Sequence, residues 1–125
     1  MEPSIGLVIC NSGASNTGTL TGLAAYEIVI EREDIGIFSL PALANNTPRQ
    51  IVLTKKIKNL IVIDGCKNEC AKKIMDNLGI NYKNYINLDY DLEIEKMGPF
   101  TTLKYSMDEV KKVKLEILKR VENIT

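Results

Sequence analysis

The residues of this 125-residue chain with the clearest chemical potential are its three cysteines, Cys10, Cys66 and Cys70. Cys10 ends the apolar run "IGLVIC", Cys66 follows the apolar run "LIVI" by three residues, and Cys70 comes four residues later. Histidine is absent, which removes the commonest general base and the commonest nitrogen ligand for metals. A metal ion would therefore be held by sulfur and oxygen, and proton transfer would need a carboxylate, lysine, tyrosine or thiol.

Composition and charge indicate in which compartment and with which kinds of partner these thiols act. The odd number of cysteines and the lack of a recognisable signal peptide predict a cytoplasmic protein with reduced thiols. The N-terminal apolar run is too short to span a membrane, so we expect no membrane partner. Sixteen basic and sixteen acidic residues balance, which disfavours a nucleic-acid partner recruited by overall charge. The length predicts a single domain over residues 1–125.

Hydrophobic patterning predicts the elements that must position the cysteines. Short apolar runs predict four strands, at residues 4–9, 34–38, 60–63 and 85–88. Helical spacing and capping residues predict a helix from about Gly18, one over 48–57, one after Gly65, and one from Ser106 with Glu109 completing a capping box. Residues 89–100 are predicted to be a loop with one short turn at most.

The alternation of strands and helices predicts a three-layer α/β fold. We expect a small, open, mainly parallel sheet of about four strands with helices on both faces. The flavodoxin-like order 2-1-3-4 is the expected one. The carboxyl ends of parallel strands meet at one edge of the sheet, and ligands bind beyond that edge.

The predicted strand order brings the cysteines together. Cys10 ends the first strand and Cys66 follows the third, and those strands are neighbours in this order, so the thiols should share a crevice. Cys66 is expected in, or just before, the first turn of the next helix, whose N-terminus would favour a thiolate. Cys70 would then lie one turn later on the same helix face.

Three converging thiolates predict a zinc ion, which accepts sulfur at tetrahedral positions and leaves a fourth position for oxygen or water. Candidate supporting or fourth ligands are Asp64 and Ser39, which end the third and second strands, and Asp89 after the fourth. Asp64 is expected to be either a buried carboxylate with hydrogen-bond partners or a solvent-facing turn residue.

A second reading assigns the cysteines to thiol chemistry. In a thiol enzyme or redox carrier, Cys66 would be the reactive thiolate, with Cys70 or Cys10 as the resolving thiol. Cys70 also fits a purely structural role, because free cysteine is a small, usually buried hydrophobe and this one lies among the apolar positions of its helix. The spacing alone leaves these alternatives open.

A third reading concerns the loop "CNSGASNTG", which lies between a predicted strand and a predicted helix. Its small and polar residues could bind an anion through backbone N–H groups, with Ser12, Gly13, Ser15 and Asn16 as the candidates. The loop contains no cation to neutralise a phosphate, and small residues are equally expected wherever a backbone turns sharply.

Four pieces of the sequence together resemble the DGC-domain family, a group of small proteins to which zinc binding is ascribed from their cysteines. These pieces are "CNSGASNTG", "SLPALA", "VIDGCKNECAKK" and "INLDYDLEIEKMG", and the resemblance spans about residues 5–98. The segment Asp64-Gly65-Cys66 with Cys70 is the most specific of them. The resemblance implies zinc as the cofactor and implies no particular reaction.

The family pattern has four cysteines, three of which correspond to Cys10, Cys66 and Cys70. At the remaining position this chain has Ser39. A serine hydroxyl hardly ionises near neutral pH and is a poor zinc ligand. The resemblance therefore implies either three thiolates completed by water or Asp64, or a member that binds zinc weakly.

Overall fold

The computed structural model describes residues 2–125 and contains one sheet of four parallel strands. The strands are β1 (Ile5–Ile9), β2 (Ile35–Phe38), β3 (Asn59–Asp64) and β4 (Asn84–Asn87), in the order β2-β1-β3-β4. The predicted α/β class and strand order are therefore confirmed. Ile9 pairs with Ile63, and Asp64 pairs with Asn87, so β1, β3 and β4 end close together at the carboxyl edge of the sheet.

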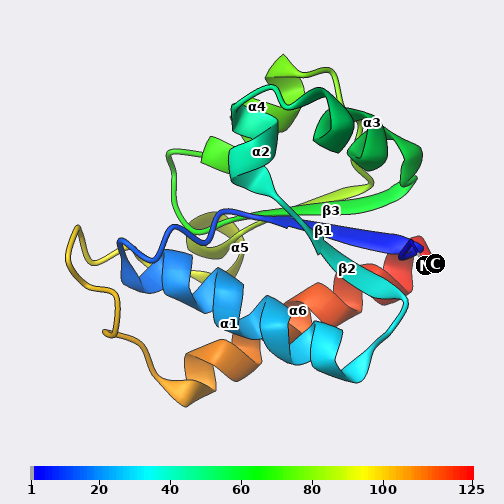
Figure 1. Ribbon diagram of the computed structural model, residues 1–125. Coiled ribbons are helices and arrows are strands. Elements are labelled where there is room, and N and C mark those ends of the chain that lie inside the picture. The colour runs from blue at the N-terminus through cyan, green and yellow to red at the C-terminus, as the bar shows by residue number, and fades with distance from the viewer. Residues whose placement is uncertain (1) are drawn as a thin grey trace.

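Six helices cover the two faces of the sheet within the described residues (Figure 1). They are α1 (Asn16–Glu31), α2 (Leu40–Ala44), α3 (Pro48–Lys56), α4 (Cys70–Asn77), α5 (Leu88–Leu92) and α6 (Met107–Ile124). Figure 1 shows α1 and α6 packed on one face and α2, α3 and α4 on the other. The sheet is therefore the middle of three layers, as predicted.

Each face of the sheet has its own hydrophobic core, which explains why the strands are continuous apolar runs. Leu7 and Ile9 point into the core beneath α1 and α6, whereas Val8 between them joins the core beneath α2 and α4. Gly6 is required in β1 because a Cβ atom there would lie 2.6 Å from the ring of Phe38. All five residues of β1 are buried, and the strand delivers Cys10 to the sheet edge without a bend.

Local capping signals place most helix ends correctly. Ser15 caps α1, and Ser106 with Glu109 forms the predicted capping box at α6. Two short helices differ from the sequence-based expectation. The helix α2 lies between the second predicted strand and the helix predicted over 48–57, where no element is predicted, and α5 occupies the start of the segment predicted as a loop. No helix in residues 2–125 has the length and apolarity needed to cross a membrane.

Candidate functional site

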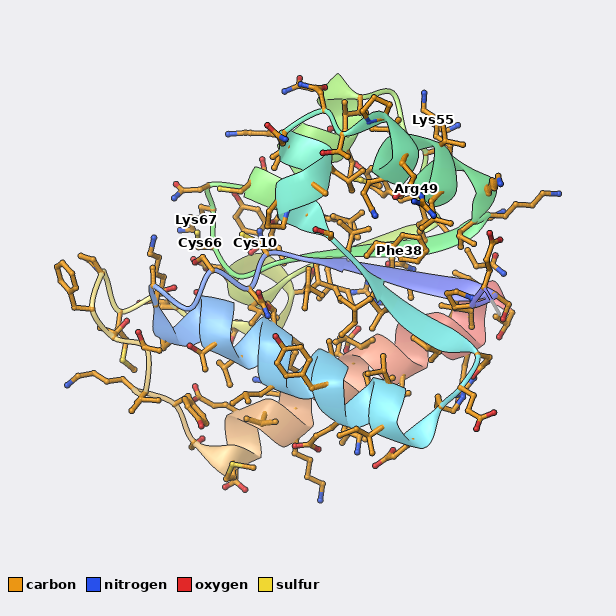
Figure 2. All side chains as sticks on the ribbon, viewed as in Figure 1. Cys10, Phe38, Arg49, Lys55, Cys66 and Lys67 are labelled. Atoms are coloured by element: carbon orange, nitrogen blue, oxygen red, sulfur yellow. The ribbon has the colours of Figure 1, made fainter. Side chains whose placement is uncertain are left out.

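Cys10 is fixed at the carboxyl edge of the sheet by its backbone (Figure 2). Its N–H donates to the carbonyl of Ile63 at 3.0 Å, which continues the pairing of β1 with β3 by one residue. Its carbonyl accepts a hydrogen bond from Thr21 Oγ1 at 3.2 Å. Figure 2 shows Cys10 and Cys66 at the same end of the sheet.

The thiol of Cys10 is strongly influenced by its surroundings. Burial, followed by the negative charges of Asp64, Cys70 and Cys66, raises the pKa of Cys10 to about 12. Cys10 therefore keeps its proton at neutral pH when no cation is nearby, and its pKa depends on the charges of both other thiols.

Cys66 lies in a turn and not in a helix. The N–H of Glu69 closes the turn by donating to the Cys66 carbonyl at 3.2 Å, and α4 begins only at Cys70. Glu69 is the N-cap and has a left-handed backbone (φ 55°), which no helix interior accepts. Of the two predicted positions for Cys66, in the first helical turn or just before it, the structure has the second, whereas the prediction that Cys66 shares a helix face with Cys70 is wrong.

Cys70 is exposed and is the first residue of α4. The buried face of this helix is formed by Ala71 and Met75, so the preceding position points away from the core. The interpretation of Cys70 as a core residue is therefore wrong. Its thiol is available to solvent and to a ligand, and its charge contributes to the raised pKa of Cys10.

Asp64 is a buried supporting residue, with only 1% of its surface exposed. Oδ1 accepts the N–H of Ala71 at 2.8 Å, and Oδ2 accepts the N–H of Lys72 at 3.0 Å. These are first-turn N–H groups of α4, which lack partners within the helix. The alternative of a solvent-facing turn residue is excluded, and the backbone donors come from the first turn of α4.

A polar network connects Asp64 to the Cys66 turn. Tyr85 Oη donates to Asp64 Oδ2 at 2.9 Å, and Asn87 Nδ2 lies 3.0 Å from Tyr85 Oη and 2.9 Å from the Cys66 carbonyl. Burial and the neighbouring carboxylate raise the pKa of Tyr85. The network therefore holds both the turn that carries Cys66 and the helix that carries Cys70.

Asn87 is a site residue that sequence reasoning missed. It is fully buried at the end of β4, and its Oδ1 accepts the N–H groups of Asp89 and Tyr90 at the start of α5. The sequence pattern predicts it only as one position of the strand at 85–88. The available signal was an amide residue placed directly before an acidic helical turn, which is a typical N-cap arrangement.

The candidate oxygen ligands Ser39 and Asp89 lie in different environments. Ser39 is exposed and caps α2, because its Oγ accepts the N–H of Ala42 at 3.3 Å. Asp89 is half-buried and lines a hollow of about 370 Å³ together with Cys66 and Lys67. Cys10 lines a different, mainly apolar hollow of about 190 Å³.

The loop before α1 is held mainly by other parts of the chain. Asn16 is fully buried; its Nδ2 donates to the carbonyl of Glu95 at 3.0 Å, and its Oδ1 accepts the N–H of Met97 at 2.9 Å. Its own N–H donates to Thr101 Oγ1 at 3.1 Å. The side chain of Asn16 therefore secures the segment after α5 and does not point toward a free anion.

The rest of this loop is shaped by short-range bonds. Ser15 Oγ accepts the N–H of Gly18 at 3.4 Å as the cap of α1, and Ser12 Oγ accepts the N–H of Ala14 at 3.3 Å. Gly13 has a φ of 73°, in the left-handed region that favours glycine. Anion binding by this loop stays a prediction.

The thiols do not form a ready-made metal site. Within residues 2–125, no group of three or more His, Cys, Asp or Glu side chains is arranged to hold a metal ion. The charges of Cys66 and Cys70 both act on the pKa of Cys10, so the three thiols lie in one neighbourhood. Sulfur ligands of one zinc ion lie about 4 Å apart, because zinc–sulfur bonds are about 2.3 Å. Since no such group is present among the described residues, side chains would have to move for all three thiols to bind one ion.

Comparison with known proteins gives one match. The model of the DGC domain matches residues 7–117, a span that includes all three cysteines, Asp64 and Asn87. No curated protein and no solved structure matches the chain.

Proposed function

The chain belongs to the DGC-domain family, and on that premise we propose that it binds zinc, or another thiophilic metal ion, through Cys10, Cys66 and Cys70. The observation that carries the proposal is that Cys10, the turn with Cys66 and the start of α4 with Cys70 lie at the same edge of the sheet. They are close enough for the charges of Cys66 and Cys70 to raise the pKa of Cys10. The role would be metal handling or metal-assisted chemistry. With three protein ligands, zinc keeps a fourth position where it can activate water or polarise a substrate oxygen.

Each proposed ligand has its own anchor in the chain. Thr21 and β3 hold the backbone of Cys10. Asp64 holds the first turn of α4, which carries Cys70, and Asn87 holds the carbonyl of Cys66. Anchored backbones limit the change needed on metal binding to side-chain rotations, which cost less than refolding a loop.

The test is the metal content of tag-free protein, combined with titration of its thiols before and after chelation. We expect about one zinc ion per chain and masked thiols that become reactive once the metal is removed. Cys66→Ser and Cys70→Ser should lose the metal, whereas Ser4→Ala, an exposed hydroxyl change at the other edge of the sheet, should keep it. Three freely reactive thiols in zinc-supplemented wild-type protein would contradict the proposal.

Ser39→Cys probes the missing family cysteine. A fourth sulfur would close the open position, so zinc affinity in a chelator competition should rise, while any reaction that needs bound water should stop. Ser39→Ala separates this effect from loss of the cap of α2. Equal affinities in Ser39→Cys, Cys66→Ser and wild type would place the metal elsewhere.

A second candidate function is thiol–disulfide exchange, which is favoured by the exposure of Cys70 and by its effect on the pKa of Cys10. The exposed Cys70 thiolate would attack a disulfide of a partner and release one partner thiolate, which takes up a proton. Cys10, after losing its proton, would then attack the Cys70 sulfur of the mixed disulfide and release the second partner thiol. The chain loses two electrons and the partner disulfide gains them.

The structure changes which thiol would act first in this second function. Cys70, and not Cys66, is the exposed cysteine at a helix start, although Asp64 already occupies N–H groups of that helix. Peptide mapping after incubation with oxidised glutathione tests the function. A Cys10–Cys70 disulfide supports it, and a mixture of all pairings or none contradicts it.

A further inference from the structure

A hollow at the opposite edge of the sheet collects three lysines. It has a volume of about 420 Å³ and is lined by Lys55, Lys58 and Lys83, with Ile57 and Ile80 among its other residues. Lys55 and Lys58 lie on either side of the end of α3, and Lys83 directly precedes β4. The hollow therefore lies where the chain enters β3 and β4, at the amino edge.

The charge in this hollow is not compensated. No carboxylate belongs to its lining, and among residues 2–125 none of the six ion pairs includes Lys55, Lys58 or Lys83. The chain as a whole has as many acidic as basic residues, so partners were available in number. Like charges around one hollow repel one another, and an anion between them converts that repulsion into attraction.

The walls of the hollow are formed before any ligand arrives. Ile57 and Ile80 are buried. The N–H of Ile80 donates to the Met75 carbonyl at 3.0 Å, and the N–H of Lys83 donates to the Leu60 carbonyl at 2.8 Å. The three lysines are exposed at the rim, so their ammonium groups stay hydrated and free to move onto a ligand.

We propose that this hollow binds a small molecule that carries a diphosphate or triphosphate group. Lysine ammonium groups are compact point charges that suit the spread charge of phosphates, whereas planar carboxylates are best matched by the arginine fork, which this hollow lacks. The volume lies within the range of small-molecule sites, and the apolar residues Ile57 and Ile80 can contact an uncharged part of the ligand.

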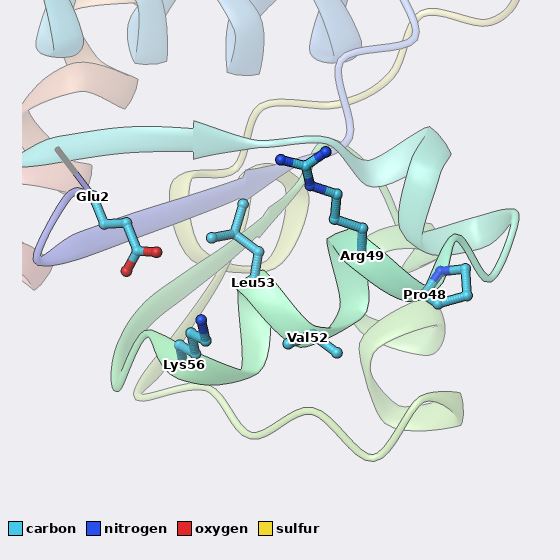
Figure 3. A pocket seen from close by; sticks show the side chains of 6 residues that line it. All are labelled: Glu2, Pro48, Arg49, Val52, Leu53 and Lys56. Carbon is cyan, nitrogen blue, oxygen red and sulfur yellow. The ribbon is translucent and has the colours of Figure 1, made fainter.

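A compact anion fits better than a nucleic acid. The neighbouring hollow on α3 has a volume of about 440 Å³ and includes Arg49 and Lys56, but the carboxylate of Glu2 belongs to the same lining (Figure 3). The positive charge therefore does not continue as an unbroken track along which a nucleic-acid backbone could lie.

This site is independent of the cysteines. Figure 2 shows Lys55 at the other end of the sheet from Cys10 and Cys66. Loss of phosphate binding would leave zinc binding untouched, and loss of zinc would leave phosphate binding untouched. The two proposals can therefore fail separately.

Titration calorimetry with inorganic pyrophosphate tests the proposal on the full chain, with Lys58→Gln/Lys83→Gln as the variant. Lys111→Gln/Lys119→Gln is the matched control, because it removes two exposed lysines of α6 that have no ion pair among the described residues. Wild type and control should each bind one pyrophosphate with equal affinity. In the Lys58→Gln/Lys83→Gln variant, the affinity for pyrophosphate should fall by about tenfold or more for each lysine removed. Orthophosphate should bind more weakly than pyrophosphate.

Several outcomes would overturn the proposal. These are no saturable heat with wild type at millimolar pyrophosphate, equal losses in variant and control, or orthophosphate binding as tightly as pyrophosphate. A single-stranded oligonucleotide that binds more tightly than pyrophosphate, with the same dependence on Lys58 and Lys83, would replace the small phosphate ligand by a nucleic acid. Thermal melting of each variant confirms that it is folded.

Discussion

The two edges of the sheet are built on opposite principles. At the carboxyl edge, buried polar residues such as Asp64 and Asn87 hold the segments that carry the cysteines. At the amino edge, an apolar floor is surrounded by exposed lysines without ion pairs among the described residues. Buried polar groups are costly unless every one is paired, whereas exposed charges cost little. Substitutions at the first edge should therefore destabilise the protein, and those at the second should not.

Asp64→Asn should produce the largest loss of stability. An amide has one acceptor oxygen, so its NH₂ group would face the N–H of Lys72 or the hydroxyl of Tyr85 in a buried place. We expect the free energy of unfolding to fall by about 2–4 kcal/mol, measured by urea denaturation. Asp108→Asn, at an exposed position in the first turn of α6, should cost no more than about 1 kcal/mol. Similar losses in the two variants would remove the contrast between buried and exposed carboxylates.

Asn87→Ala should have the next largest effect, about 2 kcal/mol, because it removes the cap of α5 and the bond to the Cys66 carbonyl. The looser turn should also weaken zinc binding by about tenfold, as supporting residues of metal sites commonly do. Asn77→Ala, at an exposed position at the end of α4, should change neither quantity. Unchanged zinc affinity in Asn87→Ala would show that the turn does not position a ligand.

Alkaline pH should lower stability through Cys10. Its pKa is raised from 9.0 to about 12 in the folded chain, so the folded state keeps a proton that the unfolded state releases. The contribution is present below pH 9.0 and is lost as the pH rises toward about 12. The slope should stay below about 1.4 kcal/mol per pH unit, because the partly exposed thiol is screened by solvent.

The measurement for Cys10 is urea denaturation of metal-free protein across this alkaline range. Cys10→Ala should have a shallower slope than wild type, and Tyr85→Phe should reduce the slope above pH 10, since the pKa of Tyr85 is also raised. Identical slopes in all three proteins would show that the folded state does not hold these protons.

Lys58→Gln/Lys83→Gln should have the smallest effect on stability, within about 0.5 kcal/mol of wild type, because both side chains are exposed. Any change should be a gain at low salt, where repulsion among the remaining cations is least screened. A loss comparable to that of Asp64→Asn would mean that the lysines support the fold, and the contrast between the edges would fail.

The fold could be predicted largely because its strong signals are local. Continuous apolar runs mark the strands, and the pair Ser106 and Glu109 marks the start of α6. The helices α2 and α5 have five residues each, too few for a periodic pattern. They depend on one side-chain cap each, Ser39 and Asn87, and on packing against the rest of the molecule.

The candidate site was predictable only where it follows from strand ends. Cys10 lies at the carboxyl edge because β1 ends at the preceding residue, independently of the conformation of the loops. The shared helix face of Cys66 and Cys70 was predicted wrongly because the turn depends on a left-handed Glu69 and on Asn87, which is 21 residues from Cys66. Asp64 caps a helix that begins six residues later, so this role could not be predicted from a short capping motif in the sequence.

The burial of Asn16 has a consequence for motion. The segment from Glu95 to Thr101 has no regular secondary structure, yet the N–H of Met97 is bonded to Asn16 and that of Phe100 to the Ala14 carbonyl. Such amides exchange with solvent only when the whole anchored unit opens, so the segment should exchange slowly and move with the core. Phe100, which is 94% exposed, therefore projects into solvent from a segment that we expect to be rigid.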